Sequence, residues 1–321
     1  MKIALILAGY GLVLAVAGPR LLACASWTAR APRLAIACWQ ALCLAVVASA
    51  MLAGLALAVP TMRISGDLAM LLRACVMALR AQYATPGGAA VSIAGAVLAL
   101  AVFARVTWCL GSHLTSARRE RTRHRRAVAL VGALDRETGV SVVPDDRPAA
   151  YCLPGRGHRI VLTSAALAAL GPAELAAVIA HERAHVRGRH HLALAFTAAL
   201  AAAFPRIGLF SMAASQTARL VELAADDAAC ATSDELTLAE ALLSMAGPGA
   251  PAMALAAGGD VADRIRRLIA GRRPLPRWAA RLGLAAAVAL LMVPFVIAAE
   301  PAVAATGMDY CPLTTPTNVM R

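Results

Sequence analysis

Long runs without charged residues alternate with basic stretches along this chain. An α-helix needs about 20 apolar residues to cross a bilayer, and four runs approach or exceed that length. A cleaved signal peptide is the alternative for the first run, but Arg20 and the later apolar runs argue against cleavage. We therefore predict four transmembrane helices, at residues 1–18, 34–60, 88–110 and 282–299.

The remaining pattern divides the chain into domains. Residues 1–112 are predicted to hold three transmembrane helices, with a mixed loop at 61–87. Residues 113–281 read as a soluble α+β domain, and residues 300–321 as a short tail. The fold class is therefore an α-helical membrane protein with an inserted α+β domain.

Within the inserted domain, short β-branched runs predict strands and longer periodic segments predict helices. Residues 192–204 are apolar but too short to span, which favours a buried or membrane-dipping helix. Residues 247–259 read as a loop. An amphipathic helix is predicted at 261–270, and we expect its Arg264, Arg266 and Arg267 to lie on the solvated side. Strands are predicted at 140–143, 149–153 and 159–163, and helices at 128–134, 164–171, 217–230 and 235–245. A further helix is predicted to begin at Pro172 within the stretch 171–191.

The helix expected to begin at Pro172 carries His181, Glu182 and His185, which form an HExxH motif. Histidines four residues apart on a helix leave the same face, so two neutral imidazoles can bind one Zn²⁺. Glu182 projects beside them, where a carboxylate can act as general base on a water molecule. The alternative is a surface helix with two solvated histidines.

A zinc site of this type needs a third ligand, and acids follow on the helix at 217–230. Glu222 and Asp226 are four residues apart and share one helix face, whereas Asp227 is rotated by about 100°. We predict that Glu222 completes the metal site and that Asp226 orients a ligand histidine. Asp227 is expected to be solvated.

Composition supports membrane insertion. Hydrophobic residues make up 60% of the chain, charged residues only 15%, and the net charge is +13. Residues 116–126 are densely basic but contain no aromatic residue for base stacking, so we expect contact with anionic lipid and no direct binding of nucleic acid. Binding to DNA remains an alternative that rests on charge alone.

Basic residues also predict the topology. The stretches at 19–33, 116–126 and 272–281 are rich in arginine and fall on one side of a four-span chain. The positive-inside rule places them in the cytoplasm, together with the α+β domain. Both termini then lie outside. The 8 cysteines show no metal-binding spacing, and pairing of Cys75 with Cys311 is left open.

The motif and its surroundings resemble a known family. HERAH at 181–185, Glu222-x-x-x-Asp226 and the flanking hydrophobic spans are similar to the BlaR/MecR-type antirepressor zinc metallopeptidases, which are gluzincins related to the HtpX and CAAX-prenyl proteases. The order of short strands and helix before the motif is also similar. The resemblance covers residues 145–231 in detail, and it implies that the strand near 149–153 pairs with the substrate main chain.

The resemblance implies a membrane-embedded zinc endopeptidase that cleaves a cytoplasmic protein, such as a winged-helix repressor, in signalling. Residues 300–321 cannot form the penicillin-sensor domain of that family, so we expect no β-lactam sensing. The group that stabilises the oxyanion is left open, with His158, His190, His191 and basic surface residues as candidates. The alternative function is a non-catalytic membrane signalling or scaffold protein with a structural zinc site.

Overall fold

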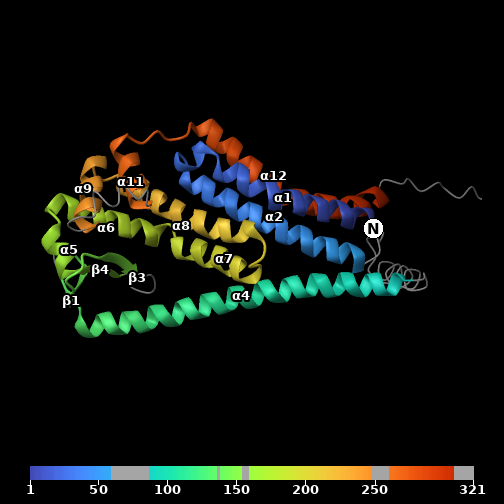
Figure 1. Cartoon of the computed structure of the whole chain (residues 1–321), viewed down its shortest axis with the longest axis horizontal. Helices are drawn as coiled ribbons and strands as arrows, with labels where there is room; N and C mark the ends of the chain where they lie inside the picture. Colours follow the sequence, from blue (N-terminus) through green and yellow to red (C-terminus); the bar gives the residue numbers. More distant parts are fainter. Residues whose placement is uncertain (59–86, 136–137, 154–158, 247–259, 307–321) are drawn as a thin grey trace, which may run out of the picture. The chain divides into compact units, whose positions relative to one another are not determined.

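The computed structural model describes residues 1–58, 87–135, 138–153, 159–246 and 260–306. Within these residues the chain is mainly helical, with one small sheet (Figure 1). The predicted loops at 61–87 and 247–259, the tail beyond 306, His158 and the Cys75–Cys311 pair lie outside the described residues.

Four of the described helices are long and apolar enough to cross a membrane, as the sequence predicts. They are α1 (Lys2–Ala23), α2 (Pro32–Ala58), α4 (Gly88–Val131) and α12 (Arg277–Thr306). A short 3₁₀ helix, η1 (Ser26–Ala29), links α1 and α2.

Three of these helices run beyond their predicted ends, among them α12, which extends past both ends of the predicted span 282–299. We expected Pro19 to end the first helix, but α1 continues through it to Ala23, since one proline removes a single backbone hydrogen bond. The helix predicted at 128–134 is not separate. Its first residues close α4, which continues without a break through the basic run at 116–126.

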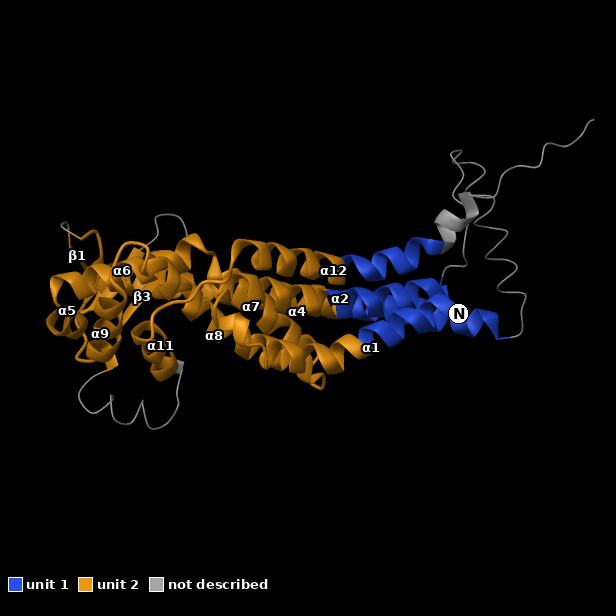
Figure 2. Cartoon of the chain, turned by 90° about the horizontal axis from the view of Figure 1, so that it is seen from above, with its two compact units in different colours: residues 1–12, 45–103, 291–321 blue, residues 13–44, 104–290 orange. Residues whose placement is uncertain are grey.

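The chain forms two compact units, coloured in Figure 2. One holds residues 1–12, 45–103 and 291–321, and the other holds residues 13–44 and 104–290. The second unit contains the whole sheet and the HExxH helix. The predicted domain boundaries at 113 and 281 remain predictions.

The sheet has four strands in the order β1-β2-β4-β3. β2 and β4 are parallel, and the other two pairs are antiparallel. Because β3 comes last in the strand order, it is an edge strand of the sheet. Strands predicted at 140–143, 149–153 and 159–163 match β2, β3 and β4 to within a residue. The bounds are β1 (Ala133–Leu134), β2 (Ser141–Val143), β3 (Ala150–Leu153) and β4 (Arg159–Thr163).

Alternation along β4 buries both faces of the sheet. Ile160 and Leu162 pack with helices α5 (Ser164–Ala169) and α6 (Pro172–Arg187), whereas Val161 packs with Val128 at the end of α4. The Thr163 hydroxyl accepts a hydrogen bond from the backbone of Ala166 and caps α5.

Within the described residues, four more helices lie wholly in this unit. α7 (His190–Ala203) and α8 (Gly208–Ala229) lie side by side, and α8 also packs on α6 (Figure 1). α9 (Glu235–Ala246) and α11 (Asp260–Ile269) pack on each other through Leu238, Ile265 and Leu268, and this cluster reaches Ala177 of α6. These contacts hold α6 against α8.

Candidate metal centre

Helix α6 begins as its sequence predicts. Gly171 precedes the helix, Pro172 occupies the first turn, and Glu174 Oε2 accepts a hydrogen bond from the Gly171 backbone at 2.7 Å. Ala177, Val178 and Ala184 are buried on the same helix as His181. Because α6 is packed on both the sheet and α8, its histidines are directed into the protein rather than into solvent.

The structure brings three of the predicted site residues together. Nε2 of His181 lies 3.1 Å from Nε2 of His185, and each lies 3.5 Å from an oxygen of Glu222 on α8. Among the described residues, these three form a group whose ligand atoms all lie within 4.8 Å of one another.

The separations fit a tetrahedral metal site. Ligand atoms bound at 2.0–2.1 Å to one tetrahedral ion stand roughly 3.3 Å apart. Two imidazole nitrogens and one carboxylate are also a donor set typical of catalytic zinc, with a fourth position open for water or substrate. The residues present therefore fit a zinc ion in both chemistry and spacing.

Asp226 lies directly behind His181. Its Oδ1 is 3.0 Å from Nδ1 of His181, the ring nitrogen that does not face Glu222. The two atoms form an ion pair but no hydrogen bond: Nδ1 of His181 is a buried atom without a hydrogen-bond partner in the described structure. Asp226 is fully buried. Its position is the one we predicted for a carboxylate that orients a ligand histidine.

Arg264 of α11 completes this arrangement, and our expectation of a solvated Arg264 is wrong. Its side chain is only 10% exposed and donates two hydrogen bonds to Asp226, at 2.8 and 2.7 Å. A third nitrogen lies 3.1 Å from Glu222. The physical reason is that the fully buried Asp226 carboxylate needs a cation, and bidentate pairing with a guanidinium supplies it.

Our expectation of a solvated Arg267 is also wrong. It is partly buried and contacts Asp227 at 2.6 Å and the Ala29 carbonyl at 3.1 Å. Asp227 is therefore paired rather than solvated, with Arg272 as a second neighbour at 3.7 Å. Of the three arginines we expected in solvent on α11, only Arg266 is exposed.

Charges at the site shift the pKa values of its members. Burial opposes protonation of His181, but the neighbouring carboxylates of Asp226 and Glu222 outweigh it and raise the pKa to about 9. Burial also opposes ionisation of Asp226, yet Arg264 and His181 lower its pKa to about 2. Without a metal the site thus holds a proton on His181, which a metal ion would replace.

His185 is held from its other side by His190, at the start of α7. The two Nδ1 atoms lie 3.1 Å apart, so Nε2 of His185 is left to face Glu222. Burial lowers the pKa of His185 to about 4, which keeps this ring neutral. A side chain at Gly188 would collide with His190, so the turn between α6 and α7 needs glycine there. His190 therefore braces a ligand and does not face the open side of the site.

Glu182 lies against the edge strand. It is close enough to Cys152 in β3 for each residue to shift the pKa of the other, and burial raises the pKa of Glu182. Glu182, the candidate for the general base, therefore lies next to the edge strand β3. Sequence reasoning missed Cys152, which carries no motif.

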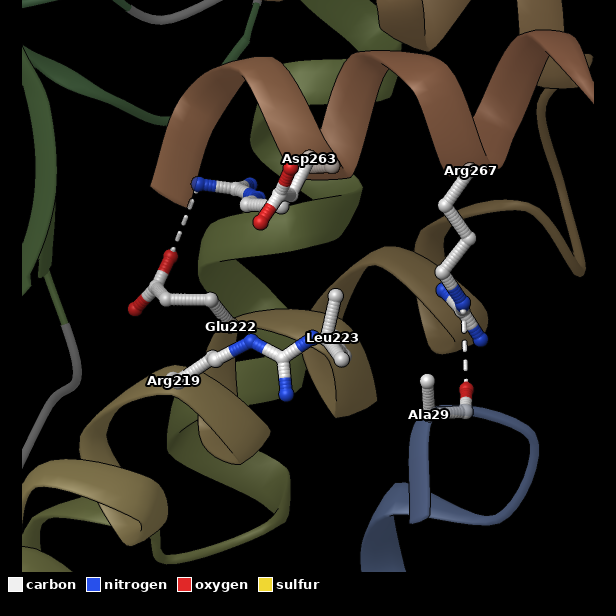
Figure 3. A pocket seen from close by; sticks show the side chains of 7 residues that line it. Ala29, Arg219, Glu222, Leu223, Asp263 and Arg267 are labelled. Atoms are coloured by element: carbon white, nitrogen blue, oxygen red, sulfur yellow. Dashed lines mark hydrogen bonds and ion pairs between the residues drawn. The ribbon is translucent and has the colours of Figure 1, made fainter. Parts of the chain in front are cut away.

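A cavity of about 260 Å³ opens beside the metal group. Figure 3 shows Glu222, Arg219 and Arg267 around it, with α11 forming one wall. The remaining lining residues are Ala29, Leu223, Asp263 and Arg264.

Comparison with known proteins agrees with this geometry. Residues 114–270 match the model of peptidase family M48. The chain is also 42% identical over 94 residues to a Protease HtpX homolog from Acidiphilium cryptum (strain JF-5). That alignment covers 27% of this chain and 31% of the relative, so the chain spans about a third of the length of the curated relative it matches. No solved structure matches the chain.

These findings support a metallopeptidase of the M48 type. They also support the predicted relationship to HtpX proteases. Neither finding bears on the predicted BlaR/MecR antirepressor type.

Proposed function

We propose that this chain is a membrane-bound zinc endopeptidase whose active site is the His181, His185 and Glu222 group. The observation that carries the proposal is the convergence of these three ligand atoms at separations of 3.1–3.5 Å, next to Glu182. The match to peptidase family M48 supports the same reaction class.

Each residue has a role in peptide hydrolysis. His181, His185 and Glu222 hold the metal ion, which when bound acidifies a water molecule and polarises the scissile carbonyl. Glu182 accepts a proton from the attacking water and passes it to the leaving nitrogen. Burial raises the pKa of Glu182, which makes its carboxylate a stronger base than a solvated one. A purely structural zinc site has no use for a carboxylate at this position, which counts against the scaffold alternative.

The surrounding residues position these groups. Asp226, held by Arg264, fixes the ring of His181, and His190 fixes the ring of His185. The edge strand β3 offers backbone groups to an extended substrate, and the Cys152 backbone lies beside Glu182. A peptide paired with β3 would present its carbonyl to the metal group.

We infer a cytoplasmic protein as substrate. The inference rests on the basic stretches at 19–33, 116–126 and 272–281, which by the positive-inside rule place residues 113–281 in the cytoplasm. Cleavage of a winged-helix repressor in signalling is the role that the antirepressor resemblance supports.

Comparative proteomics tests this function. Membrane and cytoplasmic proteins of cells that carry the wild-type chain are compared with those of cells that carry Glu182→Ala. A cytoplasmic protein should accumulate intact, and its fragments should vanish, in the variant. Identical fragment patterns in the two strains would contradict the proposal.

A further inference from the structure

A second cavity lies on the other side of His190 from the metal group. Its volume is about 580 Å³, within the range of small-molecule sites. One wall is the first turns of α2, and the other is the corner between α6 and α7. The lining residues are Arg33, Ile36, Gln40, Arg187, Gly188, Arg189, His190, Leu192 and Ala193.

Three arginines line this cavity, and no acidic residue does. In the described part of the chain, the guanidinium groups of Arg33, Arg187 and Arg189 have no hydrogen bond or ion pair to a carboxylate. Arg264 and Arg267, in contrast, both pair with acids. Like charges held around one cavity repel each other, so this arrangement is stabilised by an anion.

His190 forms the inner end of the cavity. The residue is 6% exposed, and its Nδ1 is occupied by His185. Its Nε2 lies next to Gly188, which also lines the cavity. Arg33 is close enough to act electrostatically on this ring. The cavity therefore combines three cationic side chains with the ring that contacts the metal-ligand candidate His185.

The position along α2 identifies the kind of anion. Arg33 is the second residue of α2, a helix apolar enough to cross a membrane, so the cavity lies where such a helix leaves the hydrocarbon layer. Lipid headgroup phosphates lie at this level. Ile36, Leu192 and Ala193 add an apolar side that suits a glycerol backbone and acyl chain, whereas a free phosphate ion has no use for it.

We propose that this cavity binds the headgroup phosphate of an anionic phospholipid through Arg33, Arg187 and Arg189, with the acyl side along Ile36 and Leu192. A lipid held there would touch the ring that braces the metal ligand His185. The proposal does not depend on peptidase activity.

The test is lipid binding by the full chain purified in detergent. Phosphatidylglycerol and phosphatidylcholine are titrated separately, and native mass spectrometry counts the lipid that stays bound. The wild type should retain one phosphatidylglycerol in preference to phosphatidylcholine. Each basic residue near a membrane contributes about fivefold to anionic lipid affinity, so Arg33→Gln should lose about that factor.

Two further variants and a control sharpen the test. Arg189 has a φ of 49°, so Arg189→Gly removes the charge and suits the backbone. Together with Arg33→Gln it should reduce binding roughly 25-fold, from about fivefold per arginine. Arg159→Gln removes one exposed charge on β4, outside the cavity, and should leave binding unchanged.

Three results would overturn the proposal. Equal retention of both lipids would exclude recognition of the phosphate charge. An equal effect of Arg33→Gln and Arg159→Gln would assign binding to general surface charge. Displacement of phosphatidylglycerol by millimolar inorganic phosphate, with the same arginine dependence, would assign the site to a free phosphate ion.

Discussion

At the scale of residues, the central feature is Asp226, which lies between a ligand histidine and a buried arginine. Its carboxylate is fully buried, 3.0 Å from His181 Nδ1 and bound twice by Arg264. Loss of its charge weakens the orientation of His181 and leaves Arg264 with less compensation. Zinc affinity and local stability therefore depend on the same side chain.

We predict that Asp226→Asn lowers zinc affinity about 10- to 100-fold, the usual effect of removing a partner behind a ligand. Competitive titration of the purified protein with a zinc chelator measures this. Asp227→Asn is the matched control, because Asp227 pairs with Arg267 and Arg272 and not with the histidines. Equal zinc affinity in the two variants would contradict the role of Asp226.

The sequence indicated His181, Glu182 and His185 through the HExxH motif, and Glu222 and Asp226 through their spacing of four residues on one helix face. It did not indicate Arg264. The basic run around residues 264–267 looked like a solvated face, yet Arg264 is four residues before the buried Leu268 and shares its side of α11. That spacing was the available signal. Which partner the arginine meets depends on the packing of α11 against α8, which the sequence does not reveal.

At the scale of elements, the Arg264 pair joins α11 to α8. We predict that Arg264→Ala destabilises the metal-free protein by about 3–5 kcal/mol, since it removes the guanidinium that pairs twice with the buried Asp226 carboxylate. Arg266→Ala, on the exposed side of the same helix, should cost less than about 1 kcal/mol. Urea unfolding followed by tryptophan fluorescence compares them. Similar losses in both variants would show that the buried pair does not hold α11.

Helices α2 and α4 approach closely at two glycines within one unit. A Cβ at Gly95 would lie 2.5 Å from the Gly54 carbonyl, and one at Gly54 would lie 2.7 Å from the Gly95 carbonyl. Small residues allow such approach between membrane helices.

We predict that Gly95→Ala destabilises this helix pair by about 1–3 kcal/mol, the usual cost of overpacking. Gly111→Ala, on the same helix in open space, should be neutral or slightly stabilising. Thermal melting in detergent distinguishes the two. A melting temperature unchanged by Gly95→Ala would show that this approach is not maintained.

Most elements were predictable from periodicity, but some of their ends were not. The strands at 140–143, 149–153 and 159–163 and the start at Pro172 were found because turn residues and hydrophobic runs mark them. The length of α4 was missed because we used the change from apolar to basic as a boundary. Between Ser112 and Val131 there is no proline or glycine, and arginine is a good helix former, so nothing stops the helix.

At the scale of the whole molecule, the distribution of arginine predicts orientation. Reporters fused after Arg126 and Gly271 should be cytoplasmic, and reporters after Pro60 and Arg321 extracytoplasmic. Paired alkaline phosphatase and fluorescent protein fusions measure this. The reverse pattern would remove the proposed cytoplasmic substrate and leave the metal chemistry untouched.

The most direct test of the account compares wild type with Glu182→Gln for zinc content and peptide cleavage in one preparation. The variant keeps His181, His185 and Glu222 but loses the group that moves the proton. We predict one bound zinc per chain in both proteins, and cleavage of a protein substrate or of the chain itself in the wild type alone. Undiminished cleavage by Glu182→Gln, or a wild type that binds no zinc, would contradict the account.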